Sequence, residues 1–285
     1  MLIIKFIGGL GNQMFQYAFY KSLEKMGKDV KADISGYEDY ELHNGFELEK
    51  IFGINLKYAN MYDIEKYIIK KNDIIKKIMR KVSNDHATHI VCKDAYKFEN
   101  HLYKYNEKYL EGYWQNISYF RQISEIIKEE FKFKDCLTDK NLFYFEEAKN
   151  NPNSVAIHIR RGDYLDKKNN KIYGDICKKE YYLNAIKYIN NNINNPRYYI
   201  FSNDIRWVQE NLKIENAVFI DWNKDENSYI DMQLMSACNN NIIANSTFSW
   251  WGAYLNPYKN KIIVAPKKWT NVSEYNLAEE DWIKI

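Results

Sequence analysis

The sequence predicts an α/β protein with parallel sheets, and three observations support this prediction. Residues 155–159 form a short apolar run rich in β-branched side chains and bounded by turn residues, which is typical of a buried parallel strand. From there to the end of the chain, strand and helix patterns alternate, which indicates right-handed βαβ units. The chain also opens with a strand pattern, a glycine-rich turn and a helical pattern.

Length and composition restrict the class of protein. The 285 residues fit one large domain or two of ordinary size, and 46% apolar with 28% charged residues is typical of a soluble globular protein. A net charge of +3 is too small to indicate a nucleic-acid partner, so we expect none. The four cysteines form no CxxC pair, which favours a reducing compartment and disfavours zinc or disulfides. No signal peptide or membrane span is apparent, and we expect a cytoplasmic protein.

The first element is a strand at residues 2–7, which leads through a glycine-rich turn at residues 8–11 into a helix. Backbone N–H groups at the start of a helix can bind an anion, so Gly11, Asn12 and Gln13 are candidates for ligand contact. The turn lacks the third glycine of a dinucleotide motif and the Lys-Ser/Thr pair of a P-loop. The alternative is a plain strand-to-helix turn in which Asn12 and Gln13 cap the helix.

A basic amphipathic pattern begins at Lys66 and ends at Lys81, with isoleucines spaced between the basic residues. Such a helix can lie on an anionic membrane surface, which would place the protein peripherally on the inner membrane face. A solvated helix face is the more common explanation for the same pattern.

The middle of the chain contains the predicted domain boundary. A strand running into a loop is expected at residues 109–116, followed by helices at residues 117–131 and 138–149. Residues 150–154 are polar and contain one of only four prolines, which marks them as a linker. We therefore expect two domains, residues 1–150 and 151–285.

The second half alternates between strands and helices. After the strand at 155–159, further strands are expected at residues 198–201, 217–220, 241–244 and 261–264. The helices between them are expected at residues 179–190, 205–212, 227–238 and 248–255.

Three of these strands are followed by clusters of polar residues. The clusters are, in chain order, His158, Arg160, Arg161 and Asp163; Ser202, Asn203 and Asp204; and Asn245, Ser246, Thr247 and Ser249. Parallel strands end at the same edge of a sheet, where α/β proteins bind ligands, so we expect the clusters to converge. Arginines offer a planar fork of donors to phosphate, and the amino terminus of a helix favours anions. The set predicts a nucleoside diphosphate site, whereas surface turns and ordinary helix caps are the alternative.

Three motifs carry a family resemblance. They are HIRRGDY at residues 158–164, GGLGNQMFQYA at residues 8–18 and NSTFSWWG at residues 245–252. Together they resemble the α-1,2-fucosyltransferases of glycosyltransferase family 11. The first motif alone is shared with α-1,6- and protein O-fucosyltransferases, and the other two narrow the resemblance to the α-1,2 group.

The resemblance implies a GT-B-type fold of two Rossmann-like domains with the donor cleft between them. Residues 1–150 would form the acceptor-side domain, and residues 151–285 would bind GDP-fucose. The implied reaction is an inverting, metal-independent transfer of L-fucose from GDP-fucose to the 2-hydroxyl of a terminal galactose on a surface-glycan or O-antigen oligosaccharide. No Asp-x-Asp motif occurs to hold a metal on a diphosphate, so we expect neither a metal nor a cofactor.

The resemblance also implies roles for single residues. Arg160 would contact the β-phosphate of the donor, and His158 would contact the donor or hold Arg160, unless it is a core histidine. Asp163 is the candidate general base, or else it orients the arginines. The remaining donor-binding candidates are Arg161, Ser202, Asn203, Asp204, Asn245, Ser246, Thr247, Ser249, Gly11, Asn12 and Gln13.

Two other functions stay open at this point. One is a GDP-fucose-dependent transferase with a different linkage or acceptor. The other is a sugar-binding protein without catalytic activity, suggested by the 16% aromatic content. A sugar-binding module has no need of two arginines at the end of a strand.

Overall fold

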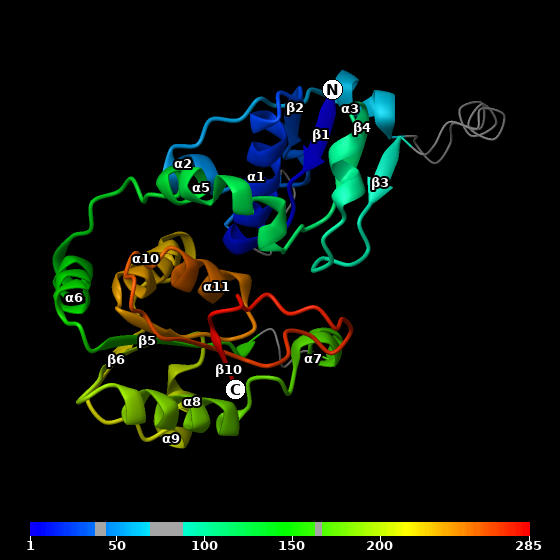
Figure 1. The fold of residues 1–285 in the computed structure, drawn as a ribbon. Coiled ribbons are helices and arrows are strands. Elements are labelled where there is room, and N and C mark those ends of the chain that lie inside the picture. The colour runs from blue at the N-terminus through cyan, green and yellow to red at the C-terminus, as the bar shows by residue number, and fades with distance from the viewer. Residues whose placement is uncertain (38–43, 69–87, 163–166) are drawn as a thin grey trace. The chain divides into compact units, whose positions relative to one another are not determined.

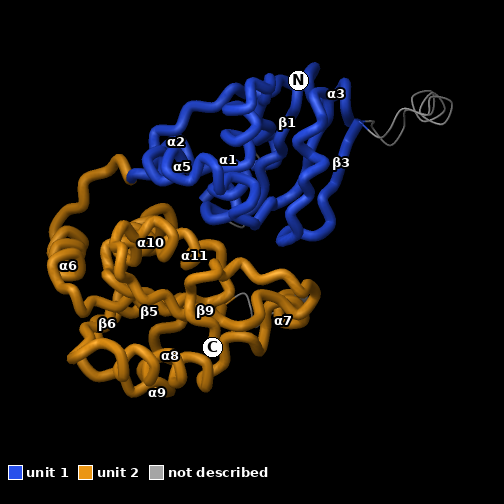
Figure 2. Tube along the Cα trace, in the orientation of Figure 1, with its two compact units in different colours: residues 1–132 blue, residues 133–285 orange. Residues whose placement is uncertain are grey.

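The computed structural model describes residues 1–37, 44–68, 88–162 and 167–285. The chain divides into two compact units, residues 1–132 and residues 133–285 (Figure 2). Each unit contains its own parallel sheet, as the alternation of strands and helices predicts.

The first unit is built on a four-stranded sheet in the order β2-β1-β4-β3 (Figure 1). Its strands are β1 (Leu2–Lys5), β2 (Val30–Asp33), β3 (His89–Val91) and β4 (Lys108–Glu111). Its helices are α1 (Leu10–Lys25), α2 (Leu48–Phe52), α3 (Met61–Tyr67) and α5 (Ser124–Glu130). Helix α1 buries the apolar residues that recur at helical spacing, among them Met14, Phe15 and Phe19, each fully buried.

In this unit one predicted helix is wrong, and another lies mostly outside the described residues. Residues 117–131 were expected as one helix, but two short 3₁₀ turns, Ile117–Tyr119 and Arg121–Ile123, precede α5. The reason is that the side chain of Asn116 accepts from the backbone N–H of Ser118, and Phe120 leaves helical geometry at φ −141°. Of the basic segment from Lys66 to Lys81, only the first residues are described, because residues 69–87 lie outside the described ranges.

The second unit has a six-stranded parallel sheet in the order β10-β9-β8-β5-β6-β7. The strands are β5 (Ser154–Ile159), β6 (Arg197–Ser202), β7 (Ala217–Ile220), β8 (Asn240–Ile242), β9 (Ile263–Ala265) and β10 (Ile283–Lys284). The helices are α6 (Asp139–Asn150), α7 (Lys167–Tyr173), α8 (Lys179–Asn192), α9 (Ile205–Asn211), α10 (Tyr229–Ala237) and α11 (Thr247–Tyr254). Helices α8 and α9 cover one face of the sheet, and α10 and α11 cover the other (Figure 1).

The division between the units lies earlier than the linker at residues 150–154 that the sequence suggested. Helix α6 belongs to the second unit, because Asn141 on α6 exchanges side-chain hydrogen bonds with Asn223 at 2.9 and 3.0 Å. The ring of Tyr144, also on α6, packs against Trp222 with centroids 5.5 Å apart. Among the described residues, no helix is long and apolar enough to cross a membrane.

Candidate active site

The alternation of side chains along β5 decides which residues lie on each face of the second sheet. Val155, Ile157 and Ile159 face the apolar cluster formed with α8 and α9, and all three are fully buried. His158 therefore points to the opposite face, where its ring centroid lies 5.8 Å from that of Phe248 on α11. Arg160 follows at the carboxyl end of the strand and is partly exposed.

His158 is held neutral by its surroundings. The residue is only 6% exposed, and burial, together with the positive charge of Arg160, lowers the pKa of the imidazole to about 3. Its buried Nδ1 has no hydrogen-bond partner among the described residues. Burying an unsatisfied polar nitrogen is costly, so this atom marks a position where a ligand atom could complete the structure.

The three polar clusters lie at one edge of the second sheet, as their order in the sequence predicts. Strand β5 pairs in parallel with β6 on one side and with β8 on the other. The carboxyl ends of all three strands are therefore neighbours in the order β8-β5-β6. Asp163 lies outside the described residues.

The side chains of the second cluster, Ser202, Asn203 and Asp204, bond mainly to other groups of the protein. Asn203 Oδ1 accepts the backbone N–H of Arg161 at 3.0 Å, and Asp204 Oδ2 pairs with Arg161 Nε at 3.2 Å. The guanidinium of Arg161 also stacks on the ring of Trp207 at 3.9 Å, and Asp204 Oδ1 accepts from the backbone N–H of that residue. Ser202 Oγ accepts the backbone N–H of Asp204. Arg161 and these three polar residues thus join the end of β5 to the start of α9.

Gly162 leaves space for the side chain of Asn203 in this arrangement. A Cβ atom at position 162 would overlap Nδ2 of Asn203, the same side chain that holds the backbone of Arg161. A larger residue at this position would therefore displace the Asn203 side chain from the backbone of Arg161.

The third cluster combines side chains that bond within the protein with two residues at the start of a helix. Asn245 Nδ2 donates to the carbonyls of Tyr173 and Trp269, both at 3.1 Å. Ser249 is fully buried, and its hydroxyl bonds the carbonyls of Ala244 and Ser246. Ser246 is the N-cap of α11 and its side chain makes no capping bond there, while Thr247 is the first helical residue. These two residues, at a helix amino terminus, are the members of the cluster best placed for an anion.

In the first unit, the glycine-rich turn is stabilised by side-chain amides. Gln13 is fully buried and donates to the carbonyls of Gly8 and Gly45 at 3.0 and 2.8 Å. Asn12 Oδ1 accepts from Gln115 Nε2 at 2.8 Å. Gly11 lies in the first turn of α1, whose N-cap is Gly9. These contacts give Asn12 and Gln13 a structural role, which was the alternative interpretation of the motif.

Glu47 and Asp231 have carboxyl groups with raised pKa values, and the sequence had singled out neither of them. Glu47 accepts from the Asn44 side chain at 3.2 Å and from the backbone N–H of Leu10 at the start of α1, and burial raises its pKa. Asp231 accepts from Asn223 at 2.8 Å, and burial raises its pKa to about 7. A single carboxyl in the apolar pattern of α10 could have indicated Asp231, whereas no pattern marks Glu47.

Within the described ranges, no three histidine, cysteine or acidic side chains gather as potential metal ligands.

Comparison with known proteins now decides the family. The sequence profile described as Glycosyl transferase family 11 matches residues 1–285. The chain belongs to glycosyltransferase family 11. It is thus a glycosyltransferase of the group that includes the galactoside α-1,2-fucosyltransferases, as its motifs predict.

Relatives of known name agree with this assignment. An α-1,2-colitosyltransferase from Escherichia coli is 33% identical, with 100% of this chain and 99% of the relative covered. The O-antigen biosynthesis glycosyltransferase WbnK from Escherichia coli is 30% identical, with 98% of each covered. The galactoside α-(1,2)-fucosyltransferase 2 of Rattus norvegicus is 24% identical over 90% of this chain and 67% of the relative.

A solved structure confirms the fold. The fucosyltransferase NodZ from Bradyrhizobium matches 90% of this chain and 92% of its own, with a TM-score of 0.52 and 12% sequence identity. The two parallel Rossmann-like sheets therefore form the GT-B type of fold that the sequence motifs imply.

Proposed function

We propose that this family 11 enzyme transfers L-fucose from GDP-fucose to the 2-hydroxyl of a terminal galactose, with inversion and without a metal. The observation that carries the proposal is the convergence of Arg160, His158 and the Ser246–Thr247 helix start on the adjacent ends of β5 and β8. We infer that the diphosphate binds there.

The chemistry explains why an arginine is needed. In the reaction the bond between C1 of fucose and the GDP oxygen breaks, and a new bond forms between C1 and the acceptor oxygen. Negative charge builds up on the β-phosphate as the nucleotide leaves. The guanidinium of Arg160 keeps its positive charge at any working pH and stabilises that charge where it develops. In phosphoryl transfer such an arginine accelerates the reaction on the order of 10³–10⁵-fold, and we expect the lower end here.

His158 supports the leaving group as a neutral hydrogen-bonding residue. With a pKa of about 3, its imidazole carries no charge near neutral pH and cannot replace an arginine as a cation. A nucleotide oxygen or N–H group at Nδ1 would satisfy the nitrogen that lacks a partner among the described residues. We therefore assign His158 to donor contact.

The proton of the acceptor hydroxyl requires a destination. We assign it to Asp163, which follows Gly162 in the sequence and lies outside the described residues. A carboxylate at hydrogen-bond distance from the hydroxyl is a suitable general base.

A second donor is favoured by one relative. The α-1,2-colitosyltransferase is 33% identical over the whole chain, and colitose is fucose without its 3-hydroxyl group. GDP-colitose is therefore the alternative donor for the same site and the same linkage. A pocket that hydrogen-bonds the 3-hydroxyl would discriminate strongly against the deoxy sugar.

Incubation of the purified protein with GDP-fucose and lactose tests the proposal. Release of GDP together with a 2′-fucosylated, α-linked product in the NMR spectrum is the expected result. Parallel reactions with GDP-colitose rank the two donors by kcat/KM. Absence of any sugar transfer from both donors would contradict the proposed function, and a product with another linkage would correct it.

A further inference from the structure

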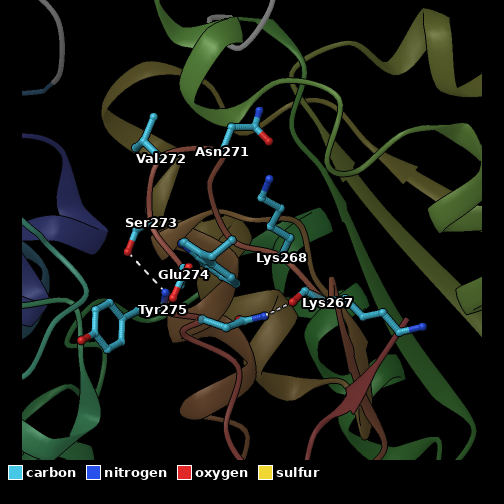
Figure 3. Close-up of a pocket in the computed structure, with 9 residues that line it drawn as sticks. Lys267, Lys268, Asn271, Val272, Ser273, Glu274 and Tyr275 are labelled. Carbon is cyan, nitrogen blue, oxygen red and sulfur yellow. Dashed lines mark hydrogen bonds between the residues drawn. The ribbon is translucent and has the colours of Figure 1, made fainter.

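A pocket of about 300 Å³ lies in the loop that connects β9 to β10 in the second unit (Figure 3). Residues 267–269 and 271–276 line it, and the three polar clusters contribute none of them. Pockets for small ligands range from about 300 to 1,000 Å³, so this one suits a ligand the size of a single sugar unit.

The pocket is linked directly to the candidate donor site. Strand β9 pairs with β8, so the loop begins at the same carboxyl edge of the sheet, on the side away from β6. Asn245 connects the two regions, because its Nδ2 donates to the carbonyl of Trp269, one of the lining residues. A ligand in this pocket would therefore lie beside the end of β8.

The backbone of the loop is fixed by hydrogen bonds. The backbone N–H of Asn271 donates to the carbonyl of Ile172 at 2.7 Å, and its side chain donates to Gly174 at 2.9 Å. Asn276 Nδ2 donates to the carbonyls of Pro266 and Lys267 at 3.0 and 2.7 Å. Because these bonds order the loop before any ligand arrives, binding costs less conformational entropy.

The side chains that project from this frame suit a sugar. Tyr275 is 45% exposed although it is a large aromatic residue, and an exposed ring can stack on the apolar face of a pyranose. In Figure 3, Lys268 extends on the side of Asn271 and Tyr275 lies at the opposite end, while Lys267 points away from both. Lysine supplies donors for hydroxyl oxygens, and the carboxylate of Glu274 supplies an acceptor.

We propose that this pocket binds the sugar unit next to the galactose of the acceptor. The inference rests on the proposed function. The lining offers hydrogen-bond donors from lysine and an acceptor from Glu274, which suits a neutral polyhydroxyl ligand. The pocket would therefore add an acceptor contact from the second unit to the acceptor-side domain that the resemblance implies for residues 1–150.

Acceptors of two lengths test this proposal in the full-length enzyme. Methyl β-galactoside presents galactose alone, and lactose adds one neighbouring sugar. For Tyr275→Ala we expect the KM for lactose to rise about tenfold, in line with the loss of one aromatic contact. The KM for methyl β-galactoside and that for GDP-fucose should stay unchanged. Tyr62→Ala is the control, because Tyr62 is 71% exposed on α3 of the first unit.

The outcomes separate the two proposals. An equal rise in KM for both acceptors, a rise in the KM for GDP-fucose, or no change at all would overturn the pocket assignment while leaving the proposed function intact. If the wild-type protein transfers no sugar, the proposed function fails, and saturation-transfer NMR with lactose then tests the pocket directly. Signals weakened by Tyr275→Ala and by Lys268→Met, but not by Tyr62→Ala, would support it, and equal signals in all variants would reject it.

Discussion

At the scale of single residues, the two adjacent arginines have different roles. Arg161 is paired with Asp204, stacked on Trp207 and held at its backbone by Asn203. Its guanidinium therefore joins the β5 and β6 loops, and we propose that Arg160 is the arginine that binds the phosphate. We describe Arg161 as a positioning residue that orients the loop in which Arg160 lies.

This assignment predicts coupled effects of Arg161→Lys and Asp204→Asn. A partly exposed ion pair and a cation–π contact contribute about 1 kcal/mol each, so either variant should lower the free energy of unfolding by about that amount. The double variant should cost less than the sum of the two single variants, because they remove one shared interaction. Urea unfolding measures all three. Arg206→Lys serves as the control, since that side chain is 89% exposed.

Strict additivity of the two single variants would show that Arg161 and Asp204 do not interact in solution. A rise in the KM for GDP-fucose without any loss of stability would instead place Arg161 on the donor.

The lowered pKa of His158 predicts that the stability of the protein depends on pH. Its pKa of about 3 in the folded protein lies below the ordinary value of about 6.5. Between these two pH values the imidazole is protonated in the unfolded chain and neutral in the folded protein. This contribution is fully present above pH 6.5 and is lost as the pH falls, by up to about 1.4 kcal/mol per pH unit. The difference between wild type and His158→Phe in urea unfolding should show this slope between pH 6.5 and 4. A flat difference would mean that the imidazole is accessible to protons.

At the scale of elements, α6 and α10 are joined by a chain of polar side chains. Asn141 on α6 bonds Asn223 after β7, and Asn223 bonds Asp231 on α10. Trp222 Nε1 also donates to Asn141 at 2.8 Å. This network explains why α6 packs with the second unit, although the polar residues after it resemble a linker.

Asp231 gives this network a pH dependence opposite to that of His158. Its pKa of about 7 lies above the ordinary value, so the folded state holds a proton that the unfolded chain has released. Stability should therefore decrease as the pH rises from 4 to 7 and then level off. Asp231→Asn should remove this trend, and the variant should be more stable than wild type at pH 8 when both are unfolded by heat. Asp221→Asn, an exposed residue after β7, is the matched control.

At the scale of the whole molecule, each unit has its own sheet and its own buried core. The three polar clusters all lie in the second unit, so we expect a fragment of residues 133–285 to fold and to bind GDP within about tenfold of the full-length affinity. Residues 1–132 alone should not bind it. Isothermal titration calorimetry with GDP measures both fragments. Binding that requires the full chain would show that the first unit, through the turn at Gly11, supplies most of the affinity.

Much of this architecture could be predicted from the sequence, because apolar periodicity and strand ends are local signals. The strands at 155–159, 198–201 and 217–220 agree with β5, β6 and β7 to within one residue at each end. Parallel order then brings three polar clusters to one edge without further information. The three motifs likewise identified the family.

What the sequence could not provide depends on contacts between distant residues. Ser202, Asn203 and Asp204 stay predicted donor ligands, but the sequence did not show that their side chains also accept the backbone N–H groups of Asp204, Arg161 and Trp207. Gln13 holds Gly45, which is 32 positions away along the chain. The loop that holds the pocket is likewise bonded to Gly174, which directly follows α7 and lies 97 positions away from Asn271.

The most direct test of this account measures fucose transfer by Arg160→Lys and by wild type in the presence of a chelator. We predict that chelated wild type keeps its full rate, because a protein cation and no divalent ion neutralises the departing nucleotide. Arg160→Lys should lose on the order of 10³-fold in kcat, because lysine lacks the forked donors. A chelated enzyme that is inactive until manganese is restored, or an Arg160→Lys enzyme with normal kcat, would contradict the account.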